Sequence, residues 1–226
     1  MKSTRARTTA LNDLVFLFDV DNTLLDNDRV IHDLRKHLHR EVGSQRARRY
    51  WSIFEALRSK LGYADYLGAL QRYRAEYPRD LRLLTVSRFL IDYPFADCLF
   101  PDALRAIDHF KRWGTVVILS DGDVVFQPRK VERSGLFKAV NGRVLIYVHK
   151  ENELDDVKKR FPARHYVLVD DKLRILTAVK NAWGRRVTTV FIRQGHYAVD
   201  RKVLATYPPA DLHVDHIGDL LHADIP

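Results

Sequence analysis

Cysteine is almost absent from this chain, since Cys98 is the only one among 226 residues. A single thiol excludes an intrachain disulfide and a zinc site made of several cysteines, and no flanking base would activate it, so we interpret Cys98 as a buried structural residue. The chain also lacks an apolar run long enough to span a membrane, and its basic first ten residues lack the apolar segment of a secretory signal. These absences predict a soluble, cytoplasmic protein with a loose basic leader.

Acidic residues are fewer than basic ones: the chain has 29 Asp and Glu and 38 Lys and Arg, which gives a formal net charge of +9. This excess favours anionic partners, either phosphorylated metabolites or nucleic acid, without identifying them. Hydrophobic residues make up 46% of the chain, which excludes a disordered protein and provides a sizeable core. A chain of this length forms either one large domain or a core with an inserted second unit.

The first apolar run, residues 14–18, is too short for a helix and predicts a strand buried on both faces. From residue 26 to 93, apolar residues recur at helical spacing, which predicts three or four helices separated near Gly43, Gly62 and Pro78. Beyond Pro94, strand and helix patterns alternate, as in a parallel sheet with helices on both faces. The expected strands are 115–119, 139–140, 143–148, 166–169 and 187–192, and the expected helices are 102–113, 124–134, 151–160 and 173–183.

Together these patterns predict an α/β fold, with a Rossmann-like doubly wound parallel sheet as its core. Residues 1–24 and 95–226 would form this core, and residues 25–94 would be a helical insertion. Near the end of the chain, His213 and His216 flank Asp215, an arrangement that would suit a metal site, but the apolar spacing favours a closing strand and helix over 212–221. Most of the arginines and histidines between 35 and 74 are expected on solvated helix faces.

Polar side chains that carry chemistry stand at the ends of four predicted strands. They are, in chain order, Asp19 with Asp21, Ser120, Lys150, and Asp170 with Asp171. In open α/β sheets ligands bind beyond the carboxyl ends of the strands, so these side chains are candidates for one site. Close carboxylates repel one another, and Mg²⁺, which prefers oxygen ligands, is the natural compensating cation. Taken singly, each residue also has an ordinary reading as a helix cap, a turn residue or a surface lysine.

The motifs around these residues resemble those of the haloacid dehalogenase-like hydrolase superfamily. DVDNT at 19–23 matches its DxDxT motif, ILSDGD at 118–123 matches its second, strand-ending motif, Lys150 matches its lone lysine, and VLVDD at 167–171 matches its acidic fourth motif. The resemblance runs from about residue 14 to 195. It implies phosphoryl transfer under a helical cap, the position that the insertion 25–94 would occupy.

The resemblance also implies roles for the acidic residues. Asp19 would be the nucleophile that forms an aspartyl-phosphate, and Asp21 would protonate the leaving group and then activate water. Mg²⁺ would be held by the Asp19 carboxylate, the backbone carbonyl of Asp21 and the Asp171 carboxylate. Asp170 would contact the ion through water or act only indirectly.

The polar residues of the middle motifs would stabilise the phosphoryl group. Ser120 would donate a hydrogen bond to a phosphoryl oxygen, and Lys150 would offset the negative charge. The sequence departs from the family pattern after the lysine, because Glu151 and Asn152 follow where many members have proline. Lys130 is therefore the alternative motif lysine, and we expect it to be more exposed than Lys150.

Two further features concern the metal and the reaction. Ile175 and Leu176 stand where the family has a later acidic residue, so metal binding is expected to depend more on Asp170. Family members that cleave carbon–halogen bonds usually lack the second aspartate of the first motif, because a halide needs no protonation, so Asp21 favours phosphate esters. The sequence predicts a magnesium-dependent phosphatase of a small phosphorylated metabolite or nucleotide. The alternatives are a phosphomutase or other phosphotransferase, and a non-catalytic module that binds anions or nucleic acid.

Overall fold

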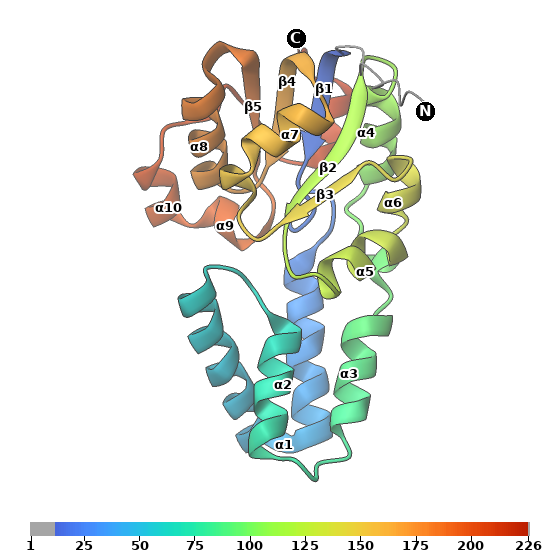
Figure 1. Cartoon of the computed structure of the whole chain (residues 1–226), viewed down its shortest axis with the longest axis vertical. Coiled ribbons are helices and arrows are strands. Elements are labelled where there is room, and N and C mark those ends of the chain that lie inside the picture. The colour runs from blue at the N-terminus through green and yellow to red at the C-terminus, as the bar shows by residue number, and fades with distance from the viewer. Residues whose placement is uncertain (1–11, 226) are drawn as a thin grey trace, which may run out of the picture.

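The computed structural model describes residues 12–225, so the predicted basic leader lies outside the described residues. One sheet of six strands has the order β3-β2-β1-β4-β5-β6, and every neighbouring pair is parallel (Figure 1). Its strands are β1 (Asn12–Phe18), β2 (Thr115–Asp121), β3 (Val144–Tyr147), β4 (Ala163–Asp170), β5 (Val187–Ile192) and β6 (Leu212–Val214). The central strands are near-continuous apolar runs because both faces of a parallel sheet are buried.

Helices cover both faces of this sheet. They are α4 (Ala103–Phe110), α5 (Phe126–Arg133), α6 (Leu136–Ala139), α7 (Leu154–Arg160), α8 (Leu173–Trp183), α9 (Gly195–Val199) and α10 (Arg201–Thr206). Alternate residues of β1 point to opposite faces: Phe16 and Phe18 enter a cluster with α4, α5 and α6, whereas Val15 and Leu17 enter one with α7 and α8. The predicted doubly wound α/β fold is therefore confirmed.

The centre of the sheet is a topological switch point. The chain runs outward from β1 through β2 to β3, and then returns to place β4 on the other side of β1. Phe18 at the end of β1 lies opposite Ile118 of β2 and Val169 of β4, so the carboxyl ends of all three strands lie on the same side of the sheet. Connections that leave in opposite directions open a crevice at such a point, and there α/β proteins bind their ligands.

Residues 25–94, the predicted helical insertion, contain α1 (Asn27–Leu61), α2 (Tyr66–Glu76) and α3 (Leu83–Asp92), which extend away from the sheet in Figure 1. All three predicted breaks are present: Gly43 interrupts α1 with non-helical backbone angles, Gly62 ends it in the left-handed conformation, and Pro78 lies in the turn between α2 and α3. Tyr50 and Tyr73 are buried where α1 packs on α2, and they belong to the same hydrophobic cluster as Phe16 and Phe18 of the sheet. The exact division between core and cap stays a prediction.

Two sequence predictions are wrong in detail. Ala139 and Val140 form no strand, because Ala139 ends α6 and the amide of Val140 donates to the Leu136 carbonyl as in a helical turn. The expected helix 151–160 is split into a 3₁₀ turn, η2 (Lys150–Asn152), and α7. The closing strand and helix over 212–221 are present as β6 and a 3₁₀ helix, η4 (Ile217–Leu221).

Across residues 12–225, no helix has both the length and the apolar character required to cross a membrane.

Candidate active site

Asp19 lies directly beyond β1, in the crevice at the switch point. Its amide donates to the carbonyl of Val169 at 3.0 Å, which extends the β1–β4 pairing and fixes the backbone. The side chain is only 2% exposed. One carboxylate oxygen, Oδ2, accepts a hydrogen bond from Thr23 Oγ1 at 3.3 Å, and the other, Oδ1, accepts one from Lys150 Nζ at 2.5 Å. Both oxygens of Asp19 are therefore held in defined positions.

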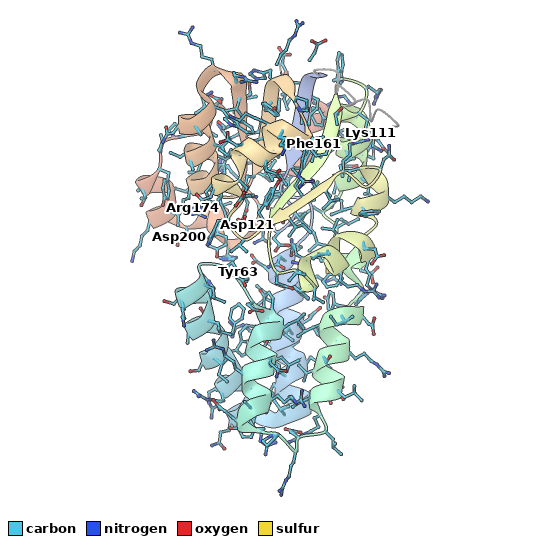
Figure 2. The ribbon with its side chains drawn as sticks, in the orientation of Figure 1. Tyr63, Lys111, Asp121, Phe161, Arg174 and Asp200 are labelled. Carbon is cyan, nitrogen blue, oxygen red and sulfur yellow. The ribbon has the colours of Figure 1, made fainter. Side chains whose placement is uncertain are left out.

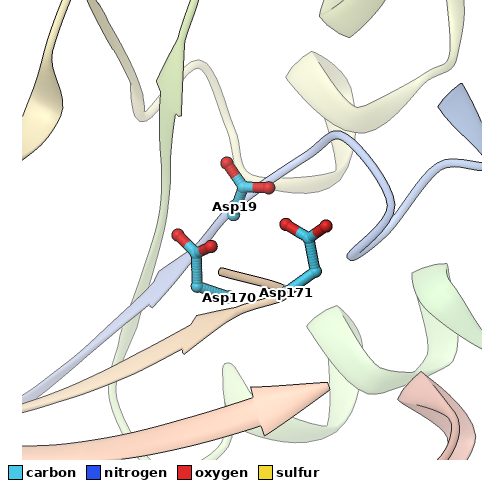
Figure 3. A group of neighbouring side chains, drawn as sticks. All are labelled: Asp19, Asp170 and Asp171. Atoms are coloured by element: carbon cyan, nitrogen blue, oxygen red, sulfur yellow. The ribbon is translucent and has the colours of Figure 1, made fainter. Parts of the chain in front are cut away.

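Asp170 and Asp171 bring two more carboxylates to the same place from the end of β4 (Figure 3). Oxygen atoms of Asp19, Asp170 and Asp171 all lie within 4.8 Å of one another, and all three residues are buried. Asp170 accepts a hydrogen bond from the amide of Lys172 at 2.8 Å and lies 2.7 Å from Lys150 Nζ. Neither oxygen of Asp171 has a hydrogen-bond partner in the described chain.

The charge of this cluster is not balanced by its protein contacts. The Lys150 ammonium pairs with Asp19 and Asp170, and the neighbouring Lys172 ammonium also attracts the three carboxylates, so two positive charges face three negative ones. Burial alone would lower the pKa of Lys150, but the carboxylates of Asp170 and Asp19 raise this pKa above its usual value. Burial raises the pKa of Asp170 and, more strongly, that of Asp171. These residues fit a divalent cation, because they offer only oxygen donors and two of the buried oxygens lack partners.

Lys150 occupies the position expected for the motif lysine. Its amide donates to Asp121 Oδ1 at 2.7 Å, and its ammonium also donates to the Leu119 carbonyl at 3.2 Å, so the loop after β3 is tied to β2. The prediction that Lys130 is more exposed is wrong, because both lysines have 0% exposure. Lys130 is buried because α5 turns it toward Asp21, at 2.6 Å, and not toward solvent.

Ser120 and Asp21 approach the cluster from β2 and from the loop after β1. Ser120 is buried, and its Oγ accepts a hydrogen bond from Gln127 Nε2 at 2.9 Å. The side chain of Asp21 remains 27% exposed. The structure thus brings Asp19, Lys150, Asp170 and Asp171 into one buried cluster, whereas Ser120 and Asp21 are linked to each other through Gln127.

A cavity of about 760 Å³ lies between the sheet edge and the helical cap, and Asp21 lines it. Figure 2 shows Tyr63, in the loop between α1 and α2, across from Asp121 and Arg174, and all three residues line this cavity. Lys172, which follows the acidic pair directly, also lines it and lies over the ring of Tyr197. The volume suits a small-molecule ligand.

Several polar residues of the site were missed by the sequence reasoning. They are Asn27, Asp121, Gln127 and Lys172, together with the contacts of Lys130. One signal was present in the sequence: Gln127 and Lys130 share a helix face with Phe126 and Val131, so polar side chains stand on the side that packs inward. His213, Asp215 and His216, by contrast, belong to no metal-binding group found in residues 12–225.

Asn22 fixes the turn that leads from the first motif into the cap. It adopts a left-handed conformation, with φ of 59°, and its Oδ1 accepts hydrogen bonds from the amides of Asn27 and Asp28 at the start of α1. Gly195 packs directly against it, since a Cβ at Gly195 would lie 2.5 Å from Cβ and Cγ of Asn22. Gly195 also has a positive φ, of 72°, so it is suited to this contact in two ways.

Gly195→Ala is expected to destabilise the fold by about 1–3 kcal/mol, because it adds both backbone strain and a clash with the first-motif turn. The free energy of unfolding is measured by urea denaturation. Gly135→Ala is the matched control, since Gly135 has a φ of +84° but nothing within 4 Å of its missing Cβ. Equal losses in the two variants would show that the contact with Asn22 is unimportant.

A Rossmann-like sheet with strand order 3-2-1-4-5-6 and an acidic cluster at its switch point defines the class of α/β enzymes to which this chain belongs. The chain belongs to the haloacid dehalogenase-like hydrolase family, whose model matches residues 14–182. It is therefore a hydrolase of this family.

Solved structures agree with this assignment. A haloacid dehalogenase-like hydrolase from Burkholderia xenovorans LB400 is 66% identical, with a TM-score of 0.90 over 94% of this chain and 99% of that one. The L-2-haloacid dehalogenase of Xanthobacter autotrophicus is 16% identical, with a TM-score of 0.60 over 92% of this chain and 96% of that one. The hydrolase YfnB of Bacillus subtilis, bound to magnesium, is 15% identical, with a TM-score of 0.61 over 93% and 97%. The last two show the fold alone. No curated protein matches this sequence.

Proposed function

We propose that this hydrolase is a magnesium-dependent phosphatase that acts on a small phosphorylated metabolite or nucleotide. The observation that carries the proposal is the buried Asp171 carboxylate, which has no hydrogen-bond partner in the described chain although it lies beside Asp19 and Asp170. A carboxylate in this setting is costly without a cation, and Mg²⁺ is commonly held by one or two carboxylates together with substrate phosphate. A dehalogenase, which displaces a halide by carboxylate attack, gives no comparable reason for this cluster.

In the proposed reaction, an oxygen of the Asp19 carboxylate attacks phosphorus while the bond from phosphorus to the ester oxygen breaks. The carboxyl group of Asp21 gives its proton to the departing ester oxygen, and the alcohol leaves. Water then attacks the aspartyl-phosphate, Asp21 takes a proton from that water, and inorganic phosphate is released with Asp19 restored. Asp21 is suited to both proton transfers because it lines the cavity that would hold the leaving group.

Three neighbouring groups would stabilise charge in this reaction. The carboxylates of Asp19 and Asp171 and the backbone carbonyl of Asp21 would hold Mg²⁺, with Asp170 supporting the site through its contact with Lys150. Bound there, the ion would offset the repulsion between Asp19 and the phosphoryl oxygens. Lys150 holds Asp19 in place, and the hydroxyl of Ser120 would donate to a phosphoryl oxygen.

Haloacid cleavage is the second candidate, because the fold is shared with L-2-haloacid dehalogenases. A phosphotransferase would use the same residues but pass the phosphoryl group to a substrate hydroxyl, so only analysis of the products separates it from a phosphatase. A non-catalytic module that binds nucleic acid through the basic surface would show steeply salt-dependent binding without turnover.

The test is a direct comparison of two reactions in the same preparation. Hydrolysis of p-nitrophenyl phosphate is expected with Mg²⁺ and is expected to stop after EDTA, because no cation then offsets the repulsion between the Asp19 carboxylate and the phosphoryl oxygens. It is expected to return when Mg²⁺ is restored. Chloride release from 2-chloropropionate is the control reaction. Chloride release that EDTA leaves unchanged, without phosphate release, would replace the phosphatase proposal by the dehalogenase one.

A further inference from the structure

The ammonium group of Lys130 has no role in the reaction as described so far, yet it is completely buried next to the site. Its Nζ donates to Asp21 Oδ1 at 2.6 Å and to Asn27 Oδ1 at 2.9 Å, and it lies 5.0 Å from the centre of the Phe126 ring. These contacts join three separate segments: the loop after β1, the first residue of α1 and the helix α5.

Stability does not explain this lysine. Burying an ammonium removes its hydration, and replacing buried ion pairs by apolar side chains of similar volume often leaves a protein equally or more stable. The same face of α5 carries Phe126 and Val131, so an apolar residue at position 130 would extend the packing already there. The free-energy cost of burying this ammonium is therefore better explained by a function of the charged group than by stability.

The geometry at Asp21 indicates what that function is. The backbone of the turn is fixed by hydrogen bonds from the amides of Leu24 and Leu25 to the Val20 carbonyl, which leaves the orientation of the Asp21 side chain to be determined. Lys130 binds one oxygen, Oδ1, and Gln127 Nε2 lies 3.5 Å from the same oxygen. Oδ2 has no hydrogen bond within the described part of the chain, and Asp21 lines the cavity.

We propose that Lys130 is a positioning residue: it anchors Oδ1 of Asp21 so that Oδ2 faces the leaving group of a phosphate ester in the cavity. The inference rests on the proposed phosphatase function, in which Asp21 is the proton donor. An acid held in one orientation transfers its proton without first losing rotational freedom, and misplacement by about 1 Å can cost about 100-fold in rate. The second contact, to Asn27, ties this orientation to the start of the cap helix α1.

The test exploits the leaving group. Phenyl phosphate releases a basic phenolate that needs a proton, whereas p-nitrophenyl phosphate releases a much less basic anion that leaves without one. Lys130→Met keeps the length and apolar stem of the side chain but removes its donor. We expect kcat/KM for phenyl phosphate to fall by about 100-fold, within the range of general acid catalysis, and kcat/KM for p-nitrophenyl phosphate to fall by less than about tenfold.

Further variants separate positioning from a general structural role. Lys130→Arg, which retains donors, is expected to recover part of the phenyl phosphate activity. Asn27→Ala removes the second anchor of Lys130, so a smaller loss with the same leaving-group dependence is expected. This variant replaces Lys130→Met in the test if Lys130→Met does not fold. Lys138→Met, at an exposed lysine on the neighbouring helix α6, is the control and should match wild type.

The outcomes distinguish this inference from the function on which it rests. Equal losses on the two esters in Lys130→Met, or wild-type activity on both, would overturn the positioning role while the phosphatase stands. A wild-type protein that hydrolyses neither ester in the presence of Mg²⁺ would overturn the proposed function, and the role of Lys130 with it.

Discussion

Asp19→Asn is expected to lower kcat/KM for p-nitrophenyl phosphate by at least about 10⁴-fold, the scale of effect seen when a nucleophile is removed. An amide oxygen at this position is a poor nucleophile and lacks the negative charge that a cation would bind. The side chain keeps its shape, since the single amide oxygen of Asn can still accept from Lys150 and its NH₂ group can donate to the hydroxyl of Thr23. The measurement is steady-state hydrolysis at saturating Mg²⁺.

Asp155→Asn is the control for this change. Asp155 lies on α7 with a side chain that is 98% exposed. The same Asp-to-Asn change there should leave the activity of the protein equal to that of wild type. The melting temperature of both variants shows whether the fold is intact. A well-folded Asp19→Asn protein that retains wild-type turnover would exclude the aspartyl-phosphate mechanism.

Asp171→Asn is expected to abolish the response of the protein to magnesium. Mg²⁺ at about 100 times its dissociation constant would stabilise the wild type by about 2.7 kcal/mol, a rise of roughly 5–10 °C in Tm for a chain of this size. The variant is expected to show no such rise at the same concentration, and the Mg²⁺ concentration for half-maximal activity should increase by at least about 100-fold. Differential scanning calorimetry with and without EDTA measures the first effect.

Asp170→Asn provides a matched comparison in the absence of metal. Asp171 is buried without a hydrogen-bond partner in the described chain, so neutralising it removes a charge that burial disfavours and should leave Tm in EDTA equal to or above that of wild type. Asp170 pairs with Lys150, so neutralising it weakens a buried ion pair and should lower Tm. A magnesium-induced rise in Asp171→Asn as large as in wild type would show that Asp171 is not a ligand.

Much of the fold could be predicted because its segments have strong periodic patterns. The segments 173–183 and 187–192 coincide with α8 and β5, which are an amphipathic helix and a fully buried strand. The segment 139–140 was assigned wrongly because two apolar residues carry no period. Their burial reflects the packing of the short helix α6 against the core, a contact between segments distant in sequence.

The part of the site that could be predicted consists of the residues at the carboxyl ends of the strands. Asp19, Ser120 and Asp170 converge because parallel strands place their carboxyl ends at one edge of the sheet, and alternation along the chain indicates parallel strands. The position of Lys130 could not be predicted in this way. Its burial depends on how α5 is rotated about its axis, which is set by packing against α3 and α6.

By itself, the sequence determined the α/β architecture, the family motifs and the edge of the sheet where the acidic residues gather, since all of these follow from local periodicity and chain order. Only the tertiary structure decided that Asp171 has no hydrogen-bond partner in the described chain. It also decided that Lys150 pairs with both Asp19 and Asp170, and that Lys130 reaches Asp21. The physical reason is that a side chain's partners are set by distances between elements remote in sequence, and those distances exist only once the elements have packed.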